Sequence, residues 1–254
     1  MKNRKIIVAN WKMNPKTDLE ARTLFAATKR SAKICKKIDV VVCPPVLYAP
    51  FFKKTDSKNL FLGAQNIFWE QGGSYTGEVS AEMVSDIGAS FAIIGHSERR
   101  AFGETDAMVS KKVLAALRSK ITVILCIGEK ERDASGAYYE FLKNQIRTSL
   151  FGVKGNSVKN ILIAYEPVWA IGKSFKDAMK PAELYEMTIF IKKVFADLFG
   201  ADVAHALQIL YGGSVNFENA KSIVTEGQVD GFIIGRESVD PENFKKLLTV
   251  VNAI

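Results

Sequence analysis

A single carboxylate stands at the end of an apolar segment. The run Asn160–Ala164 is followed by Tyr165 and then by Glu166, directly before Pro167. Proline fixes its own φ and disfavours a helical conformation for the residue before it, so the Glu166 carboxylate leaves the segment in a restricted direction. The apolar residues from Val168 to Ile171 would cover it, and burial would raise its basicity. Glu166 is therefore a candidate catalytic base, although Glu-Pro also occurs as a simple boundary between elements.

Other reactive side chains follow other apolar runs. Each one alone has an ordinary structural explanation, such as a solvated lysine or a glycine turn. Together, a carboxylate base, an imidazole, a cation and a glycine-rich phosphate site can move a proton next to a carbonyl, as in an aldose–ketose isomerisation, with no cofactor and no metal. These candidates are Asn10, Lys12, His96, Ser97, Glu98, Gly212, Gly213, Ser214, Gly235 and Arg236.

The elements that must position these residues alternate along the chain. The apolar runs predict strands over Lys5–Ala9, Val40–Cys43, Leu60–Ala64, Phe91–Gly95, Ile121–Ile127, Asn160–Ala164, Leu207–Tyr211 and Gly231–Gly235. Helical patterns lie between them, over Leu19–Lys33, Val109–Ser119, Tyr138–Leu150, Ala182–Phe199, Phe217–Thr225 and Pro241–Val250.

This alternation predicts an α/β fold with a parallel sheet, closed as a single (β/α)₈ barrel domain over residues 1–254. Active residues of such a barrel lie just after the strands, which would bring the candidates to one rim. A doubly wound open sheet is the alternative. The sequence contains no G-x-G-x-x-G or Walker-type loop, which weakens the nucleotide-binding version of that fold.

The amino-acid composition argues against a secreted, membrane-bound or disulfide-rich protein. The chain has 254 residues, of which 48% are hydrophobic, enough for a large core. The first apolar run stops at Ala9 and no apolar stretch reaches membrane-spanning length, so we expect neither a signal peptide nor a membrane partner. The cysteines Cys35, Cys43 and Cys126 are odd in number and match no metal-ligand spacing. They favour a reduced, cytoplasmic chain.

The net charge of +8 raises the question of nucleic-acid binding. The densest basic run is residues 29–37, but Ala26 and Ala27 before it and Ile34 and Cys35 within it fall at helix-compatible spacing. We therefore interpret its lysines as the solvated side of an amphipathic helix and expect no nucleic-acid partner. A positive field would also attract small phosphorylated anions.

Four segments resemble the triosephosphate isomerase family. They are Asn10–Asn14, Gly95–Arg100, Ala164–Trp169 and Tyr211–Val215, and they occur in the family's order and spacing from end to end. The resemblance implies a cofactor-free, metal-free interconversion of dihydroxyacetone phosphate and D-glyceraldehyde 3-phosphate through an enediolate-like intermediate, in glycolysis and gluconeogenesis. The family is itself a standard example of this proton-transfer chemistry.

The resemblance also implies residue roles. Glu166 is the base, and His96 is a neutral electrophile whose pKa is lowered at a helix N-terminus. Asn10 and Lys12 hold the substrate, and Ser97 and Glu98 support the catalytic groups. Further implied roles are phosphate binding by backbone N–H groups of Gly172, Ser214, Gly235 and Arg236, clamping of Glu166 by Ile171 and Ile233, a buried Arg99–Glu104 ion pair and a packing role for Cys126.

The segment Gln65–Ser80 resembles the family's dimer-forming loop. The resemblance implies a homodimer in which Thr76 approaches the partner's Asn10 and the partner's Lys12. Without the resemblance, this segment is a long glycine-containing loop, a kind of loop that is usually functional or mobile.

Two departures from the family pattern stand out. The segment Lys173–Lys180 predicts a lengthened lid before Pro181, and lid closure often sets turnover in such enzymes. Arg236 replaces the family's common second glycine. A catalytically weak barrel that binds a sugar phosphate or a partner protein, or a different phosphate-binding barrel enzyme, remains an alternative, but the joint presence of Lys12, His96 and Glu166 favours the isomerase.

Overall fold

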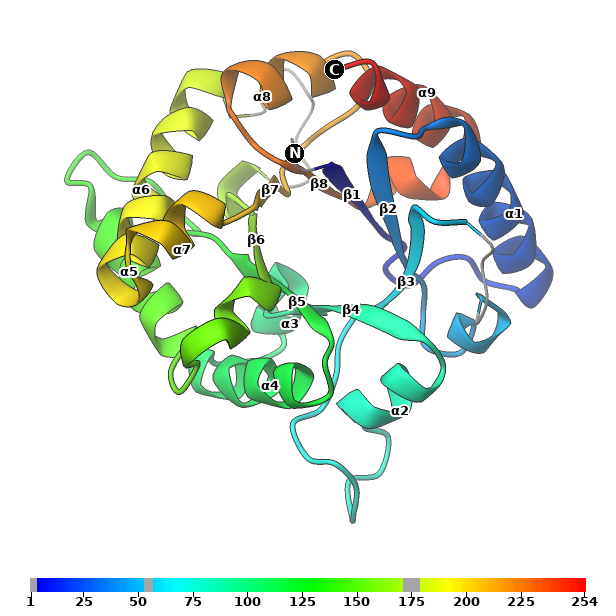
Figure 1. The fold of residues 1–254 in the computed structure, drawn as a ribbon, viewed down its shortest axis with the longest axis horizontal. Helices are drawn as coiled ribbons and strands as arrows, with labels where there is room; N and C mark the ends of the chain where they lie inside the picture. The colour runs from blue at the N-terminus through cyan, green and yellow to red at the C-terminus, as the bar shows by residue number, and fades with distance from the viewer. Residues whose placement is uncertain (1–3, 53–56, 171–178) are drawn as a thin grey trace.

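Eight parallel strands close into a barrel (Figure 1). The computed structural model describes residues 4–52, 57–170 and 179–254. The first strand pairs with both the second and the eighth, with Val8 opposite Val41 and Ile233, so the sheet closes on itself and the open-sheet alternative is wrong. The strands are β1 (Lys5–Asn10), β2 (Ile38–Cys43), β3 (Leu60–Ala64), β4 (Ala89–Ile94), β5 (Thr122–Ile127), β6 (Ile161–Tyr165), β7 (Ile209–Tyr211) and β8 (Gly231–Ile234).

Helices surround the barrel on its outside (Figure 1). Each helix that the sequence predicts is present, as α1 (Asp18–Ile34), α4 (Asp106–Arg118), α5 (Ala137–Ser149), α6 (Pro181–Phe199), α8 (Ala220–Glu226) and α9 (Pro241–Asn252). Three short helices were not predicted, because five or six residues are too few to show a helical period. They are α2 (Ala81–Asp86), α3 (Ser97–Ala101) and α7 (Ala201–Ala206).

Among the predicted boundaries that differ from the structure, two have clear local reasons. Gly95 lies beyond the end of β4 with φ of +74°, a left-handed conformation that ends the strand. The helix predicted from Phe217 begins only at Ala220. The side chain of Asn216 accepts hydrogen bonds from the N–H groups of Glu218 at 2.9 Å and Asn219 at 3.1 Å, which holds a turn in place of the first helical residues.

The basic run forms the end of α1 and the turn after it. Thr28 and Ala32 are buried, whereas Lys33 and Lys37 are exposed, so the run is the solvated side of a helix as expected. Ala26 and Ile34 are exceptions to the expected apolar face, because Ala26 is exposed and 67% of the surface of Ile34 is exposed.

Apolar side chains fill two layers. The larger layer lies between the strands and the surrounding helices, with Trp11, Phe195 and Phe244 among its largest members. The inner layer fills the barrel with Ile6, Val8, Val41, Cys43, Ile93, Ile124, Cys126, Leu162, Ala164, Leu210 and Ile233. A filled barrel leaves its strand ends as the place for a site.

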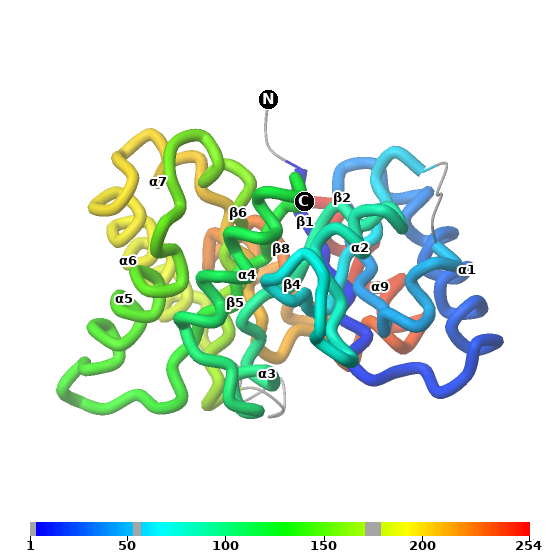
Figure 2. The backbone as a smooth tube through the Cα atoms, turned by 90° about the horizontal axis from the view of Figure 1, so that it is seen from below, coloured from blue at the N-terminus to red at the C-terminus, as the bar shows by residue number. Residues whose placement is uncertain are grey.

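The loops that follow the strands gather at one end of the barrel. Figure 2 shows α3 at this end and the start of β1 at the opposite end. None of the helices within the described ranges combines the length and apolar character that crossing a bilayer requires.

Candidate active site

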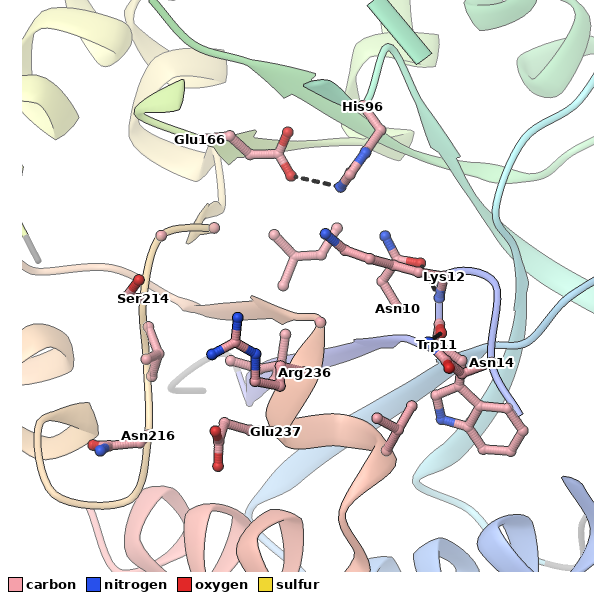
Figure 3. Close-up of a pocket in the computed structure, with 17 residues that line it drawn as sticks. Asn10, Trp11, Lys12, Asn14, His96, Glu166, Ser214, Asn216, Arg236 and Glu237 are labelled. Atoms are coloured by element: carbon pink, nitrogen blue, oxygen red, sulfur yellow. Dashed lines mark hydrogen bonds and ion pairs between the residues drawn. The ribbon is translucent and has the colours of Figure 1, made fainter. Parts of the chain in front are cut away.

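A cavity of about 650 Å³ opens at the carboxyl ends of the strands (Figure 3). Nine of the candidate site residues line it, namely Asn10, Lys12, His96, Glu166, Gly212, Gly213, Ser214, Gly235 and Arg236, together with Ile233, the residue expected to clamp Glu166. Trp11 and Asn14 also line it; they lie in the segment Asn10–Asn14 but were given no role, and Asn216, Glu237 and Val239 carried no recognisable signal in the sequence. Residues that are far apart in the chain thus meet in one place, as the barrel prediction required.

The Glu166 carboxylate is buried and held at both oxygens. Only 3% of Glu166 is exposed. The Ser97 N–H donates to its Oε2 at 3.1 Å, and its Oε1 lies 3.3 Å from His96 Nε2. Its backbone N–H donates to the Ile127 carbonyl of β5 at 2.8 Å, which fixes the residue at the end of β6.

The His96 ring is oriented by the start of α3. Its Nδ1 accepts a hydrogen bond from the Glu98 N–H at 3.2 Å. A ring nitrogen that accepts carries no proton, so the neutral imidazole holds its proton on Nε2, the nitrogen that faces Glu166 (Figure 3). The ring can therefore donate from Nε2 to an oxygen in the cavity.

Gly212 gives Glu166 its space. A Cβ on Gly212 would lie 2.7 Å from Glu166 Cγ and 2.7 Å from Ile233 Cγ2, both too close for ordinary contact. The glycine after β7 thus has a packing role beside the base, in addition to any role in binding.

Lys12 is held in a left-handed conformation with φ of +53°. Its N–H donates to Asn10 Oδ1 at 3.1 Å, and its carbonyl accepts from Gln65 Nε2 at 2.8 Å. Its ammonium group lies 2.6 Å from Glu98 Oε1 and points into the cavity (Figure 3). Glu98 therefore contacts the site through Lys12 and through the His96 ring. Gln65 is a supporting residue that sequence reasoning missed.

The other side of the cavity is formed by the residues that follow β7 and β8. Ser214 follows β7, and Gly235 and Arg236 follow β8, where η5 (Arg236–Val239) begins. The Arg236 side chain is exposed, and Figure 3 shows its guanidinium directed toward the cavity. Gly172 and Ile171 lie outside the described residues, as does the lid from Lys173 to Ala178. Met179 is buried and Lys180 precedes α6.

The predicted Arg99–Glu104 ion pair is wrong. Glu104 instead forms a buried ion pair with Lys112, whose ammonium also donates to Asn66 Oδ1 at 2.7 Å. Arg99 is exposed and lines a separate cavity. Lys112 lies nearly two helical turns into α4, on its buried face, where a lysine is rarely found without such a partner. The spacing of charged residues in the sequence therefore gave no reason to predict Lys112 as the partner of Glu104.

Cys126 lies inside the barrel beneath the site. It is 1% exposed, and burial raises the pKa of its thiol well above the ordinary value, with the nearby Glu166 charge adding to the shift. A thiol that stays protonated is a packing group, as predicted.

A hydrogen-bonded cluster lies beside the chain that leaves β6. The buried Glu129 carboxylate accepts from Arg132 Nε, Tyr165 Oη and Trp169 Nε1, each at 2.8 Å. Burial and the Glu129 charge raise the pKa of Tyr165 well above its usual value, so it remains a donor. The cluster fixes Trp169 and, with it, the segment after Glu166. Sequence reasoning assigned Trp169 to a cover and missed Glu129.

The chemistry of the cavity is that of acids, bases and amides. Within the described part of the chain, we find no group of three or more His, Cys, Asp or Glu side chains that could hold a metal ion. A buried carboxylate, a neutral imidazole and an ammonium group converge instead, and this set suits proton transfer beside a carbonyl group.

Comparisons with known proteins agree with this chemistry. Residues 5–251 match the family model described as triosephosphate isomerase. A triosephosphate isomerase of Moorella thermoacetica is 41% identical over 249 residues, which is 96% of this chain and 98% of that protein. One of Flavobacterium psychrophilum is 38% identical over 253 residues, 98% of this chain and 99% of that protein. The crystal structure of triosephosphate isomerase from Bartonella henselae superposes with a TM-score of 0.83 at 34% identity, covering 97% of this chain and 98% of that one. The chain belongs to the triosephosphate isomerase family.

Proposed function

We propose that this cavity carries out the family's activity, the interconversion of dihydroxyacetone phosphate and D-glyceraldehyde 3-phosphate, by proton transfer without a cofactor. The observation that carries the proposal is the buried Glu166 carboxylate facing the Nε2 of a neutral His96 at 3.3 Å. The reaction serves glycolysis and, in reverse, gluconeogenesis.

The geometry suggests the following steps. Glu166 removes a proton from C1 of dihydroxyacetone phosphate, and the electron pair of that C–H bond forms a C1=C2 double bond while charge develops on the C2 oxygen. His96 and Lys12 stabilise that charge, His96 by donating from Nε2 and Lys12 through its ammonium group. Proton transfer between the two oxygens follows, and Glu166 then returns a proton to C2. Asn10 holds the Lys12 backbone, and Glu98 holds the His96 ring.

The phosphate would bind on the side of the cavity formed after β7 and β8. We assign it to N–H groups of Ser214, Gly235 and Arg236, in agreement with the general phosphate site after the seventh and eighth strands of such barrels. Gly172, outside the described residues, is assigned the same role by resemblance. Because the N–H of Arg236 needs no particular side chain, an arginine is tolerated where the family commonly has glycine.

The functional test is a coupled assay on the purified protein. Dihydroxyacetone phosphate is supplied and glyceraldehyde 3-phosphate is detected, with the Glu166→Ala protein prepared in parallel as the control for contaminating enzyme. Activity in the wild type alone supports the proposal. A folded wild type that binds phosphoglycolate but does not turn over would contradict it and favour a binding role.

We also propose a homodimer formed through the segment Gln65–Ser80. This loop projects from the barrel (Figure 1), and 44% of Tyr75 is exposed near its tip. A cavity of about 250 Å³ at the base of the loop, lined in part by Val46 and Val79, would receive the partner's loop. Exposed Met13 and Phe102, on the loops after β1 and α3, would be covered in such a dimer.

Sedimentation of the wild type and of Tyr75→Asp tests the dimer. We expect a dimer for the wild type and a smaller species for the variant, because a carboxylate would have to be buried in the contact. A wild type that sediments as a monomer at micromolar concentration would contradict it. We further propose a cytoplasmic location, because the three cysteines are buried free thiols, as in proteins of reducing compartments.

A further inference from the structure

Arg100 lies behind the active site and joins two neighbouring strands. Its Nε donates to the carbonyl of Gly95, after β4, at 2.6 Å, and its Nη2 donates to the carbonyl of Cys126, in β5, at 3.3 Å. The side chain is 15% exposed. One planar group thus donates to carbonyls at the ends of two strands.

The two carbonyls lie next to the backbone of the catalytic pair. The Gly95 carbonyl belongs to the peptide that leads into His96. Cys126 precedes Ile127, whose carbonyl accepts the backbone N–H of Glu166 at 2.8 Å. A shift of either strand end would therefore change the distance between the imidazole and the carboxylate.

The guanidinium is itself held in place. Its Nη1 lies 2.5 Å from Asp106 Oδ1, at the first turn of α4, and Ser149 Oγ of α5 donates to the same carboxylate oxygen at 3.3 Å. Gly95 leaves the space it needs, because a Cβ there would lie 2.9 Å from Arg100 Nη2. The guanidinium is therefore held by Asp106 of α4, which Ser149 of α5 supports, while its Nε and Nη2 donate to two carbonyls.

We propose that Arg100 is a positioning residue that sets the separation of His96 and Glu166 by binding the ends of β4 and β5. The inference rests on the proposed roles of those two residues. Errors of about 1 Å in such a pair can cost on the order of 10²-fold in rate. A lysine offers one ammonium in place of the planar fork, so it would not reproduce both contacts.

Steady-state kinetics of Arg100→Gln and Arg100→Lys give the first test. We expect kcat to fall by at least ~10-fold in both, with KM changed by less than ~2-fold, because the phosphate-binding backbone after β7 and β8 is untouched. Arg118→Gln is the matched control, since it alters an exposed arginine at the end of α4, and it should behave as wild type.

A spectroscopic test is independent of activity. The chain has two histidines, His96 and the exposed His205 of α7, so isotope-labelled histidine gives two ring signals. We expect the His96 signal to move in both Arg100 variants while the His205 signal stays in place. If Arg100→Gln does not fold, Arg100→Lys provides both readouts.

The outcomes separate the two proposals. A folded Arg100 variant with wild-type kcat and an unmoved His96 signal overturns the inference, even if its stability is lower, because Arg100 would then support the fold alone. A wild-type protein without isomerase activity would contradict the proposed function. In that case the His96 ring signal of the Arg100 variants would still show whether Arg100 positions that ring.

Discussion

The two sides of the cavity are built differently. On the side formed after β4 and β6, His96 and Glu166 are buried side chains, each held by backbone N–H groups. On the side formed after β7 and β8, Ser214, Gly235 and Arg236 line the cavity, and we assign their backbone N–H groups to the phosphate. The difference teaches that side-chain identity matters for proton transfer, whereas backbone shape matters for phosphate binding. Substitutions on the first side should lower turnover, and substitutions on the second should mainly change affinity.

The largest effect is expected for Glu166→Ala. Loss of a positioned base should lower kcat by at least ~10²-fold. The fold should survive, because the backbone bond to Ile127 remains and a buried carboxylate is removed. Assays combined with circular dichroism check both points. A variant with most of its turnover would refute the assignment of Glu166 as the base.

Gly212→Ala tests where the two sides of the cavity meet, because Gly212 follows β7 but lies beside Glu166. The new Cβ would push against Glu166 Cγ and Ile233 Cγ2, so we expect kcat to fall by roughly 10- to 100-fold through displacement of the base. Lys33→Ala is the control, since it alters an exposed side chain of α1 that does not line the cavity. Unchanged turnover in a folded Gly212→Ala protein would show that Glu166 tolerates displacement.

Arg236→Gly tests the side formed after β7 and β8. The variant keeps the N–H assigned to phosphate and loses a guanidinium directed toward the cavity (Figure 3). We expect phosphoglycolate to bind roughly 3- to 10-fold more weakly, the scale of about 1 kcal/mol for an exposed charge pair, with kcat little changed. Arg236→Lys keeps the charge, so its affinity for phosphoglycolate should lie between those of the wild type and Arg236→Gly. A large loss of kcat with unchanged affinity would break the comparison.

Trp169→Phe should have the smallest effect. It removes one donor to Glu129, which still accepts from Tyr165 and Arg132. We expect a loss of about 1 kcal/mol in the free energy of unfolding and a fall in kcat of less than ~10-fold. Urea unfolding and steady-state assays measure these two quantities. An inactive variant would show that the cluster does more than fix the start of the segment after Glu166.

Much of the fold was predictable because buried parallel strands read as continuous apolar runs. These runs located all eight strands, and their ends located Lys12, His96 and Glu166. Closure of the sheet was predicted from the number of strand–helix units, because no single residue indicates it. Short helices such as α3 stayed hidden because their length is below the helical period needed for a signal.

Supporting residues were harder to predict, because their partners are distant in the chain. Gln65 contacts Lys12 across 53 residues, and Arg100 reaches Cys126 across 26. Glu104 pairs with Lys112, although Arg99 is the nearer basic residue in sequence. Pairing of this kind depends on helix orientation, which hydrophobic spacing does not determine beyond the buried face.

The most direct test of this difference between the two sides uses the His96→Gln variant. Its affinity for phosphoglycolate is measured by calorimetry, and its kcat is measured in the same preparation. The account predicts that kcat falls by about 10²-fold or more, the scale for losing a group that stabilises developing charge. Affinity should stay within about 3-fold of wild type, since the phosphate contacts are made elsewhere. Equal losses of turnover and affinity would contradict the separation of chemistry from binding in this site.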